Sequence, residues 1–274
     1  MAPRLLLVGC GKMGEALLAG WCAAGFGADE ILVVEPDSHK AAALAQRFGC
    51  AVLADPAQIA AEIAAGARPA AVIFAVKPQA LDAIAPAYRR FAPDSVFLSI
   101  AAGRTISSLQ RLLGPEAAVV RAMPNTPAAV GLGATVACAG ANASEEQRQL
   151  CRRLLVAVGS LSWVDDEALM DAVTAVSGSG PAYVFLLAEC LAEAGAAAGL
   201  PAELAERLAR DTVAGAGAML QRASAPAAEL RRNVTSPGGT TAAALSVLMA
   251  EDGLAPLLAR AVRAAAQRSR ELAG

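Results

Sequence analysis

The stretch "VGCGKMG", residues 8–14, follows an apolar run and opens a helical pattern. Gly9, Gly11 and Gly14 fit the spacing GxGxxG, in which the first glycine permits a tight turn and the second lets backbone amides approach a pyrophosphate. The third lets the helix pack close to the strand. An acidic residue, Glu35, ends the next apolar run about 20 residues later. The stretch therefore predicts a dinucleotide-binding βαβ unit.

Further apolar runs, without polar alternation, predict strands that are covered on both faces, as in a parallel sheet. They occupy residues 4–8, 31–34, 70–76, 95–100 and 118–123. Helix-period segments such as 15–25 and 39–49 lie between them. This alternation predicts an α/β fold with an N-terminal Rossmann domain, whose sheet is doubly wound and mostly parallel.

From about residue 165 the pattern is helical, with apolar residues at i, i+3 and i+4. The helical segments are 166–176, 182–199, 202–222 and 254–272. We therefore expect two domains, 1–163 and 164–274, of which the second is all-helical and serves in dimerisation. Several of its helices are apolar on more than one face, which predicts burial against a second subunit.

Composition and charge restrict the classes of function. Hydrophobic residues make up 56 % of the 274 residues, and a net charge of −2 with mixed signs offers no surface for nucleic acid. The apolar run 5–8 is too short for a secretion signal, and no segment approaches about 18 uninterrupted apolar residues, so we expect no membrane span. Six cysteines without CxxC pairing and a single histidine, His39, predict free thiols in a reducing cytoplasm and no metal site.

Glu35 also bears on the identity of the dinucleotide. A carboxylate at this position accepts hydrogen bonds from the ribose hydroxyls of NADH and repels the 2′-phosphate of NADPH. Ser38, His39 and Lys40 offer an alternative, because they can hold a phosphate if Glu35 moves aside. We expect NADH to be preferred and NADPH to be accepted.

Three later loops follow apolar strands, at the sheet edge where open α/β folds bind ligands. "AVKPQ", residues 75–79, is expected to line the nicotinamide ribose and the diphosphate, with Pro78 starting a helix. "SIAAGRT", residues 99–105, fits the same site. "AMPNTPA", residues 122–128, is a rigid loop that we expect at the nicotinamide pocket.

In the helical half, "NVTSPGGTTAAAL", residues 233–245, places proline and paired glycines at the start of a new helix. Such a start has free backbone N–H groups and a partial positive charge, which suit a small carboxylate. The hydroxyls of Ser236, Thr240 and Thr241 add further donors. A second break, "VSGSGPAYVF" at residues 176–185, favours a shared cleft for a small ligand.

The chain has no lysine after Lys77 and no histidine after His39. β-Hydroxyacid dehydrogenases share a GxGxMG start and a helical second domain, but they use a lysine of that domain to move the hydroxyl proton. Its absence disfavours that class and favours a substrate that already carries its proton, such as a cyclic iminium. A non-catalytic NAD(H)-sensing module remains an alternative.

Five blocks, "VGCGKMGEAL", "AVKPQ", "AMPNTPA", "DAVTAVSGSGPAYVF" and "VTSPGGTTAAAL", resemble in this order those of the pyrroline-5-carboxylate reductase family. The resemblance implies hydride transfer from NADH or NADPH to the imine carbon of Δ1-pyrroline-5-carboxylate, giving L-proline in the last step of proline biosynthesis. It also implies a homodimer, which in this family often belongs to a ring of dimers.

The same resemblance implies the residues of the site. Substrate contacts fall on Asn233, Ser236, Gly239, Thr240, Thr241 and Glu167. The hydroxyl of Thr241 is expected to contact the ring nitrogen and is the candidate catalytic group. Cofactor contacts fall on Val8, Gly9, Cys10, Gly11, Lys12, Met13, Glu35, Ala75, Val76, Lys77, Pro78, Ile100, Ala101 and Ala102. Pro56 stands where many relatives place an asparagine near the adenine.

Overall fold

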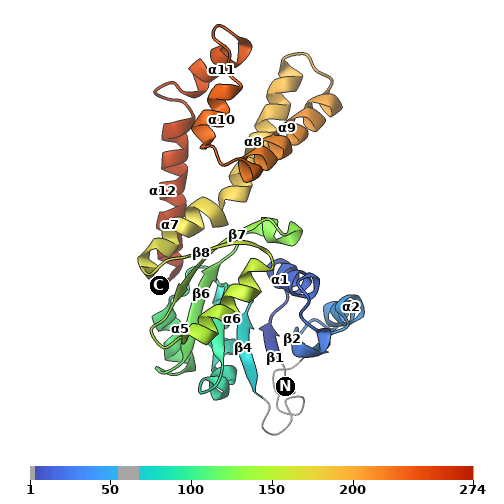
Figure 1. Ribbon diagram of the computed structural model, residues 1–274, viewed down its shortest axis with the longest axis vertical. Coiled ribbons are helices and arrows are strands. Elements are labelled where there is room, and N and C mark those ends of the chain that lie inside the picture. The colour runs from blue at the N-terminus through green and yellow to red at the C-terminus, as the bar shows by residue number, and fades with distance from the viewer. Residues whose placement is uncertain (1–3, 55–67, 274) are drawn as a thin grey trace. The chain divides into compact units, whose positions relative to one another are not determined.

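The computed structural model describes residues 4–54 and 68–273, which form two compact units (Figure 1). The first unit contains the described residues up to Gly178 and those from Ala266 onward, and the second runs from Ser179 to Ala265. The helical turns of residues 167–178 belong to the first unit. The expected domain boundary after residue 163 stays a prediction. Pro56 lies outside the described residues.

An eight-stranded sheet organises the described part of the first unit, in the order β3-β2-β1-β4-β5-β6-β7-β8. The strands are β1 (Arg4–Val8), β2 (Ile31–Val34), β3 (Ala51–Leu53), β4 (Pro69–Phe74), β5 (Val96–Ser99), β6 (Ala118–Met123), β7 (Gly133–Ala139) and β8 (Gly159–Trp163). Neighbouring strands are parallel except β6 and β7, which are antiparallel. The predicted doubly wound, mostly parallel sheet is thereby confirmed.

The central strands are buried on both faces, which explains their continuous apolar sequence. In β1, Leu5 and Leu7 belong to one core, which also contains Trp21. Leu6 and Val8 belong to a second core on the opposite face. Because successive side chains of a strand point to opposite faces, both sets must be apolar when both faces are covered.

Helices cover both faces of this sheet (Figure 1). Side chains of α1 (Lys12–Ala23), α2 (Ser38–Phe48) and α6 (Glu145–Val156) enter the first core. The second core receives side chains of α4 (Leu81–Ile84), the 3-10 helix η4 (Ala85–Phe91), α5 (Ile106–Leu113) and α7 (Met170–Val173). Short 3-10 helices complete the unit: η1 (Ala28–Glu30), η3 (Pro78–Ala80), η5 (Thr126–Val130) and η6 (Glu167–Leu169).

Three strands differ from the sequence expectation because their patterns are weak. β3 has three residues, none of them buried, and β8 lies at the other edge with alternating half-buried and exposed residues. β7 carries small residues rather than a continuous apolar run. The expected helix 166–176 is likewise divided into η6, α7 and the π-helix η7 (Thr174–Gly178).

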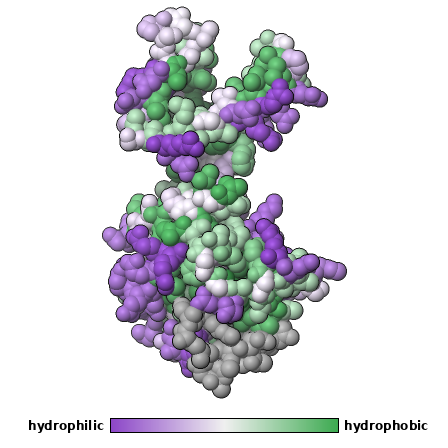
Figure 2. Space-filling view, turned by 45° about the vertical axis from the view of Figure 1, so that its right-hand side comes forward, coloured by the Kyte–Doolittle hydropathy of each residue, from purple (hydrophilic) through white to green (hydrophobic). Residues whose placement is uncertain are grey.

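The second unit is helical, as predicted. It contains α8 (Gly180–Ala197), α9 (Ala202–Arg222), α10 (Ala227–Asn233), α11 (Thr240–Leu248) and most of α12 (Leu254–Ala273). Among its described hydrophobic residues only Ala205 and Ala209 are buried. Large apolar side chains are exposed along α8, such as Phe185 and Leu186, and Figure 2 shows apolar residues on the helical surface. These helices therefore have almost no core of their own.

One helical run among the described residues bears on the expectation that the chain has no membrane span, which stays a prediction. The continuous helical run Glu167–Ala197 is long and apolar enough to span a bilayer, and an 18-residue window of it has a mean hydropathy of 1.3. Length and composition alone are weak evidence, because apolar helices of soluble proteins satisfy the same criteria.

Candidate functional site

The glycine-rich turn joins β1 to α1. Gly9 has a φ of 80° and its N–H donates to the carbonyl of Val34, 2.9 Å away. A Cβ on Gly14 would lie 2.7 Å from the carbonyl oxygen of Gly9, so the first turn of α1 packs directly on the loop. Gly11 is the N-cap of α1, and a Cβ there would meet no atom within 4 Å. The turn thus leaves open space beside the N-terminus of a helix, which suits a phosphate.

Glu35 lies directly behind this turn. The residue is only 7 % exposed, and its carboxylate accepts hydrogen bonds from the backbone N–H groups of Cys10, at 3.1 Å, and Asp37, at 3.2 Å. Lys40 at the start of α2 donates from Nζ to the same carboxylate at 2.9 Å. The charge of Glu35 is therefore balanced, and the carboxylate is held in place by three donors.

The other predicted cofactor segments lie at the same edge of the sheet. The N–H of Ala75 donates to the carbonyl of Val8, and that of Ile100 to the carbonyl of Phe74. The loops after β1, β4 and β5 are consequently neighbours at the carboxyl ends of three adjacent strands. Between β1 and β4 the chain changes direction across the sheet, and such switch points form the ligand crevices of open α/β folds.

Pro78 begins η3, and Lys77 is the N-cap of that turn, as the Lys-Pro sequence predicts. Asn125 of the third loop is buried and uses both ends of its amide within the protein. Its Nδ2 donates to the carbonyl of Ser177 at 3.0 Å, and its Oδ1 accepts from the N–H of Ala134 at 2.8 Å. Asn125 therefore joins this loop to η7. Its expected place at the nicotinamide remains a prediction.

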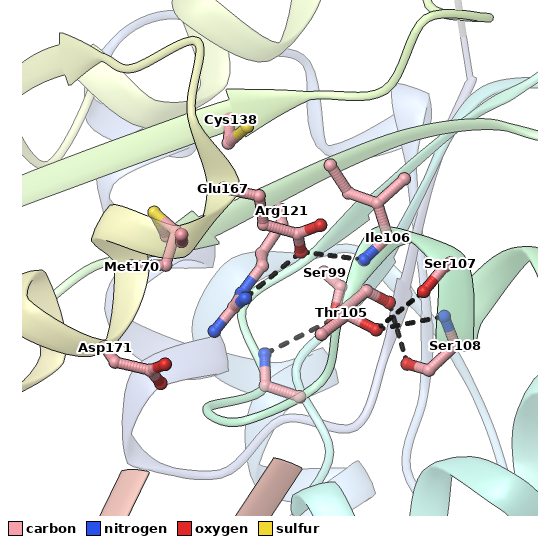
Figure 3. Close-up of polar contacts among 12 residues, drawn as sticks. Ser99, Thr105, Ile106, Ser107, Ser108, Arg121, Cys138, Glu167, Met170 and Asp171 are labelled. Atoms are coloured by element: carbon pink, nitrogen blue, oxygen red, sulfur yellow. Dashed lines mark hydrogen bonds and ion pairs between the residues drawn. The ribbon is translucent and has the colours of Figure 1, made fainter. Parts of the chain in front are cut away.

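Glu167 contacts residues that the sequence did not connect with it. Its Oε1 accepts from the N–H of Ile106 at 2.8 Å and from Nη1 of Arg121 at 3.1 Å, as Figure 3 shows. Arg121 is a buried side chain within the apolar strand β6. The substrate contact expected of Glu167 remains untested. The sequence signal that we missed is the lone arginine in an apolar strand, since a buried charge requires a partner.

The predicted carboxylate turn lies in the second unit, between α10 and α11. Gly238 has a φ of 69°, and the N–H of Gly239 donates to the carbonyl of Ser236 at 3.1 Å. Gly239 is the N-cap of α11, which begins at Thr240, and no side-chain cap bonds to this helix start. The turn brings together Ser236, Gly239, Thr240 and Thr241, while Asn233 ends α10 and Glu167 belongs to the first unit.

Four of the six cysteines are buried thiols. Cys10, Cys50, Cys138 and Cys151 are buried, Cys22 is half-buried and Cys190 is exposed. Burial raises the pKa of Cys10 and of Cys151 to about 12. Across residues 4–54 and 68–273, no group of three or more histidine, cysteine or acidic side chains could hold a metal ion.

Two family models match separate stretches of the chain. The family model for pyrroline-5-carboxylate reductase dimerisation matches residues 167–272. Residues 4–103 match the model described as NADP oxidoreductase, coenzyme F420-dependent.

Relatives match the chain over its full length. The pyrroline-5-carboxylate reductase of Pseudomonas aeruginosa is 42 % identical over 99 % of this chain and 97 % of its own. The solved structure of the Coxiella burnetii pyrroline-5-carboxylate reductase covers all of both chains with a TM-score of 0.92 and 33 % identity. That of the Plasmodium falciparum enzyme, which has NADP bound, covers 100 % of this chain and 99 % of its own, with a TM-score of 0.84 and 27 % identity.

Proposed function

The chain belongs to the pyrroline-5-carboxylate reductase family, and on that premise we propose how its residues perform the family's reaction. The reaction is the reduction of Δ1-pyrroline-5-carboxylate to L-proline with NAD(P)H, the final step of proline biosynthesis. Residues of the first unit hold the dinucleotide, and the turn before α11 holds the carboxylate of the substrate. The single observation that carries this assignment is that α11 begins directly after paired glycines and that no side chain caps its first backbone N–H groups.

The first unit has the shape that a dinucleotide requires. The space beside Gly11 admits the pyrophosphate, and the backbone amides of Lys12 and Met13 at the start of α1 bind it. The adjoining segments 75–78 and 100–102 line the nicotinamide half. Bound NAD(P)H supplies the hydride.

The turn before α11 binds the substrate carboxylate. The first amides of a helix have no intrahelical acceptor, and the helix dipole favours an anion there. The hydroxyls of Ser236, Thr240 and Thr241 supply further donors. Gly239 leaves room for the Ser236 hydroxyl at the helix start, because a Cβ there would lie 2.4 Å from Oγ of Ser236. Thr241 directs its hydroxyl to the ring nitrogen. The iminium substrate brings its own proton, so no general acid is needed.

We propose that NADH is preferred and that NADPH is accepted. Three hydrogen bonds hold Glu35, so the carboxylate does not swing aside to admit a 2′-phosphate. These three bonds leave one lone pair, on Oε1, for a ribose hydroxyl. Lys40 lies next to it and is about one-third exposed, with 35 % of its side chain accessible. Its positive charge offsets the repulsion and lets NADPH bind.

A second copy of the chain covers the apolar helices of the second unit. Phe185, Leu186 and their neighbours on α8 are exposed within one chain, in the region that the dimerisation model matches. A homodimer removes this apolar surface from water, and a ring of dimers is the larger assembly that we propose. The enzyme acts in the cytoplasm on a small molecule, with no role for nucleic acid or a membrane.

Deuterium transfer tests the reaction. With NADH deuterated at the transferred position of C4, each oxidised cofactor should place one deuterium at C5 of L-proline. Tight cofactor binding without oxidation would favour a sensing module instead. Turnover of a β-hydroxy acid in place of the imine would favour the dehydrogenase class.

A further inference from the structure

Glu167 and Arg121 form an ion pair at the base of a predicted cofactor segment. A single oxygen, Oε1 of Glu167, accepts from both the Arg121 guanidinium and the N–H of Ile106 (Figure 3). Ile106 is the first residue of α5. The Glu167 carboxylate therefore binds the N-terminus of α5, where the helix dipole favours a negative charge.

The segment that precedes α5 is the turn of residues 100–105, which contains the proposed cofactor contacts Ile100–Ala102. Its first end is fixed to the sheet, because the N–H of Ile100 donates to Phe74 and the N–H of Ala101 donates to Oγ of Ser99 at 3.3 Å. Its second end is the start of α5, where Thr105 is the N-cap. Three contacts hold this second end: the Arg104–Asp82 ion pair, the Thr105 cap on the N–H of Ser108, and the hydrogen bond from the N–H of Ile106 to Glu167.

Arg121 lies beneath the same turn. It is the register partner of Ser99, the last residue of β5, and its side chain is 5 % exposed. Glu167 comes from the start of η6, after the last strand, and is less buried. The ion pair thus joins β6 to η6, and the hydrogen bond from Ile106 adds the start of α5. These contacts lie near the end of β5.

A contribution to folding stability does not explain why an ion pair, rather than apolar side chains, occupies this place. A buried ion pair loses hydration, and well-packed apolar residues of similar volume are often as stabilising. What apolar residues cannot do is accept a hydrogen bond from the amide of Ile106. The carboxylate therefore supplies orientation at a defined point beside the cofactor segment.

We propose that Glu167, held by Arg121, is a positioning residue for the dinucleotide: it fixes the start of α5 and thereby the turn that contacts the nicotinamide half. This inference rests on the proposed cofactor site. It assigns Glu167 to cofactor binding rather than to the substrate contact that the family resemblance implies.

The test replaces the pair by apolar residues of similar length, Glu167→Met with Arg121→Met, and compares it with Glu167→Gln. The double variant keeps the packing and loses the acceptor, so its Kd for NADH should rise about tenfold, the effect of one lost charge-assisted hydrogen bond. Glu167→Gln keeps an acceptor oxygen and should lie between the double variant and the wild type. At saturating NADH the KM for the imine should change by less than about twofold. Glu146→Ala, an exposed acid on α6, is the matched control.

A folded double variant with wild-type NADH affinity would overturn the proposal. So would a raised KM for the imine with an unchanged Kd for NADH, which is the result that a substrate contact predicts. If the double variant does not fold, amide exchange in the wild-type chain decides: NADH should slow exchange of Ile106 and of residues 100–105, and unchanged exchange there contradicts the proposal. Absence of turnover in a wild-type chain that binds NADH would reject the proposed function without affecting these binding measurements.

Discussion

The carboxylate of Glu35 accepts a hydrogen bond from the backbone N–H of Cys10, 3.1 Å away, although 25 residues separate them in the chain. The acidic end of β2 is thus bound to the glycine-rich turn at which β1 ends. Lys40, in the first turn of α2, forms an ion pair with the same carboxylate, with its Nζ 2.9 Å from Oε2. The ribose end of the proposed dinucleotide site therefore contains one negative and one positive charge in contact.

Removal of the positive charge should increase discrimination between the two cofactors. For Lys40→Met we expect kcat/KM with NADPH to fall about tenfold and that with NADH to change by no more than about twofold, because only the 2′-phosphate then meets an unbalanced carboxylate. Arg47→Met removes a positive charge elsewhere on α2 and should alter neither value. An equal loss with both cofactors would contradict this account of Lys40.

Two glycines of the same turn should respond differently to an added methyl group. Gly11→Ala meets no atom of the protein, so its free energy of unfolding should fall by no more than about 1 kcal/mol, while NADH affinity falls at least about tenfold. Gly14→Ala forces a Cβ against the carbonyl of Gly9 and should cost about 1–3 kcal/mol of stability. Denaturant unfolding and NADH titration measure both. Gly11→Ala with wild-type NADH affinity would show that the pyrophosphate lies elsewhere.

The hydroxyl of Thr241 should matter for turnover and not for the dinucleotide. Thr241→Ala is expected to lower kcat at least about tenfold, since it removes a polar contact to the reacting ring, with NADH affinity nearly unchanged. Thr241→Ser keeps the hydroxyl and should be milder. Ser246→Ala removes another hydroxyl of α11, one that donates to the carbonyl of Ala243 at 2.7 Å, and serves as the control. Equal loss of NADH binding in Thr241→Ala would count against its assigned role.

The buried thiols predict a loss of stability in alkali. Burial raises the pKa of Cys10 and Cys151 from 9.0 to about 12, so the unfolded chain ionises first. The contribution of the two protonated thiols to the free energy of unfolding is complete below pH 9. It is lost as the pH rises toward 12, by about 1.4 kcal/mol for each thiol and each pH unit. Cys151→Ala should therefore flatten the decline of the unfolding free energy above pH 9. An unchanged slope in that variant would show that the thiol ionises equally in both states.

The sequence predicted the parts of the fold that carry strong local patterns. The strands at 31–34 and 118–123 agree with β2 and β6 residue for residue, because a strand covered on both faces is apolar at nearly every position. In β6 the one exception is Arg121. The edge strands β3 and β8 could not be found in this way, since exposed edges need no apolar run. The start of α11 at Thr240 was predictable from Pro237 and the paired glycines that precede it.

The side-chain contacts of the site were less accessible to sequence reasoning. Glu35 was identified because it follows the glycine-rich turn by about 20 residues along the chain, a separation that can be counted in the sequence. Its neutralisation by Lys40 depends on a rotamer at the start of α2, which no spacing specifies. The contact between Arg121 and Glu167 joins residues 46 positions apart, and the arginine is concealed within an apolar strand. Such pairings follow from the order of strands in the sheet rather than from any segment read alone.

The most direct test of the central claim is a crystal structure of the enzyme with NADH and L-proline bound together. We predict the proline carboxylate at the start of α11, within hydrogen-bonding distance of the Thr240 and Thr241 amides, with C5 of the ring facing C4 of the nicotinamide. A complex in which the turn of residues 236–241 makes no contact with proline would contradict the account.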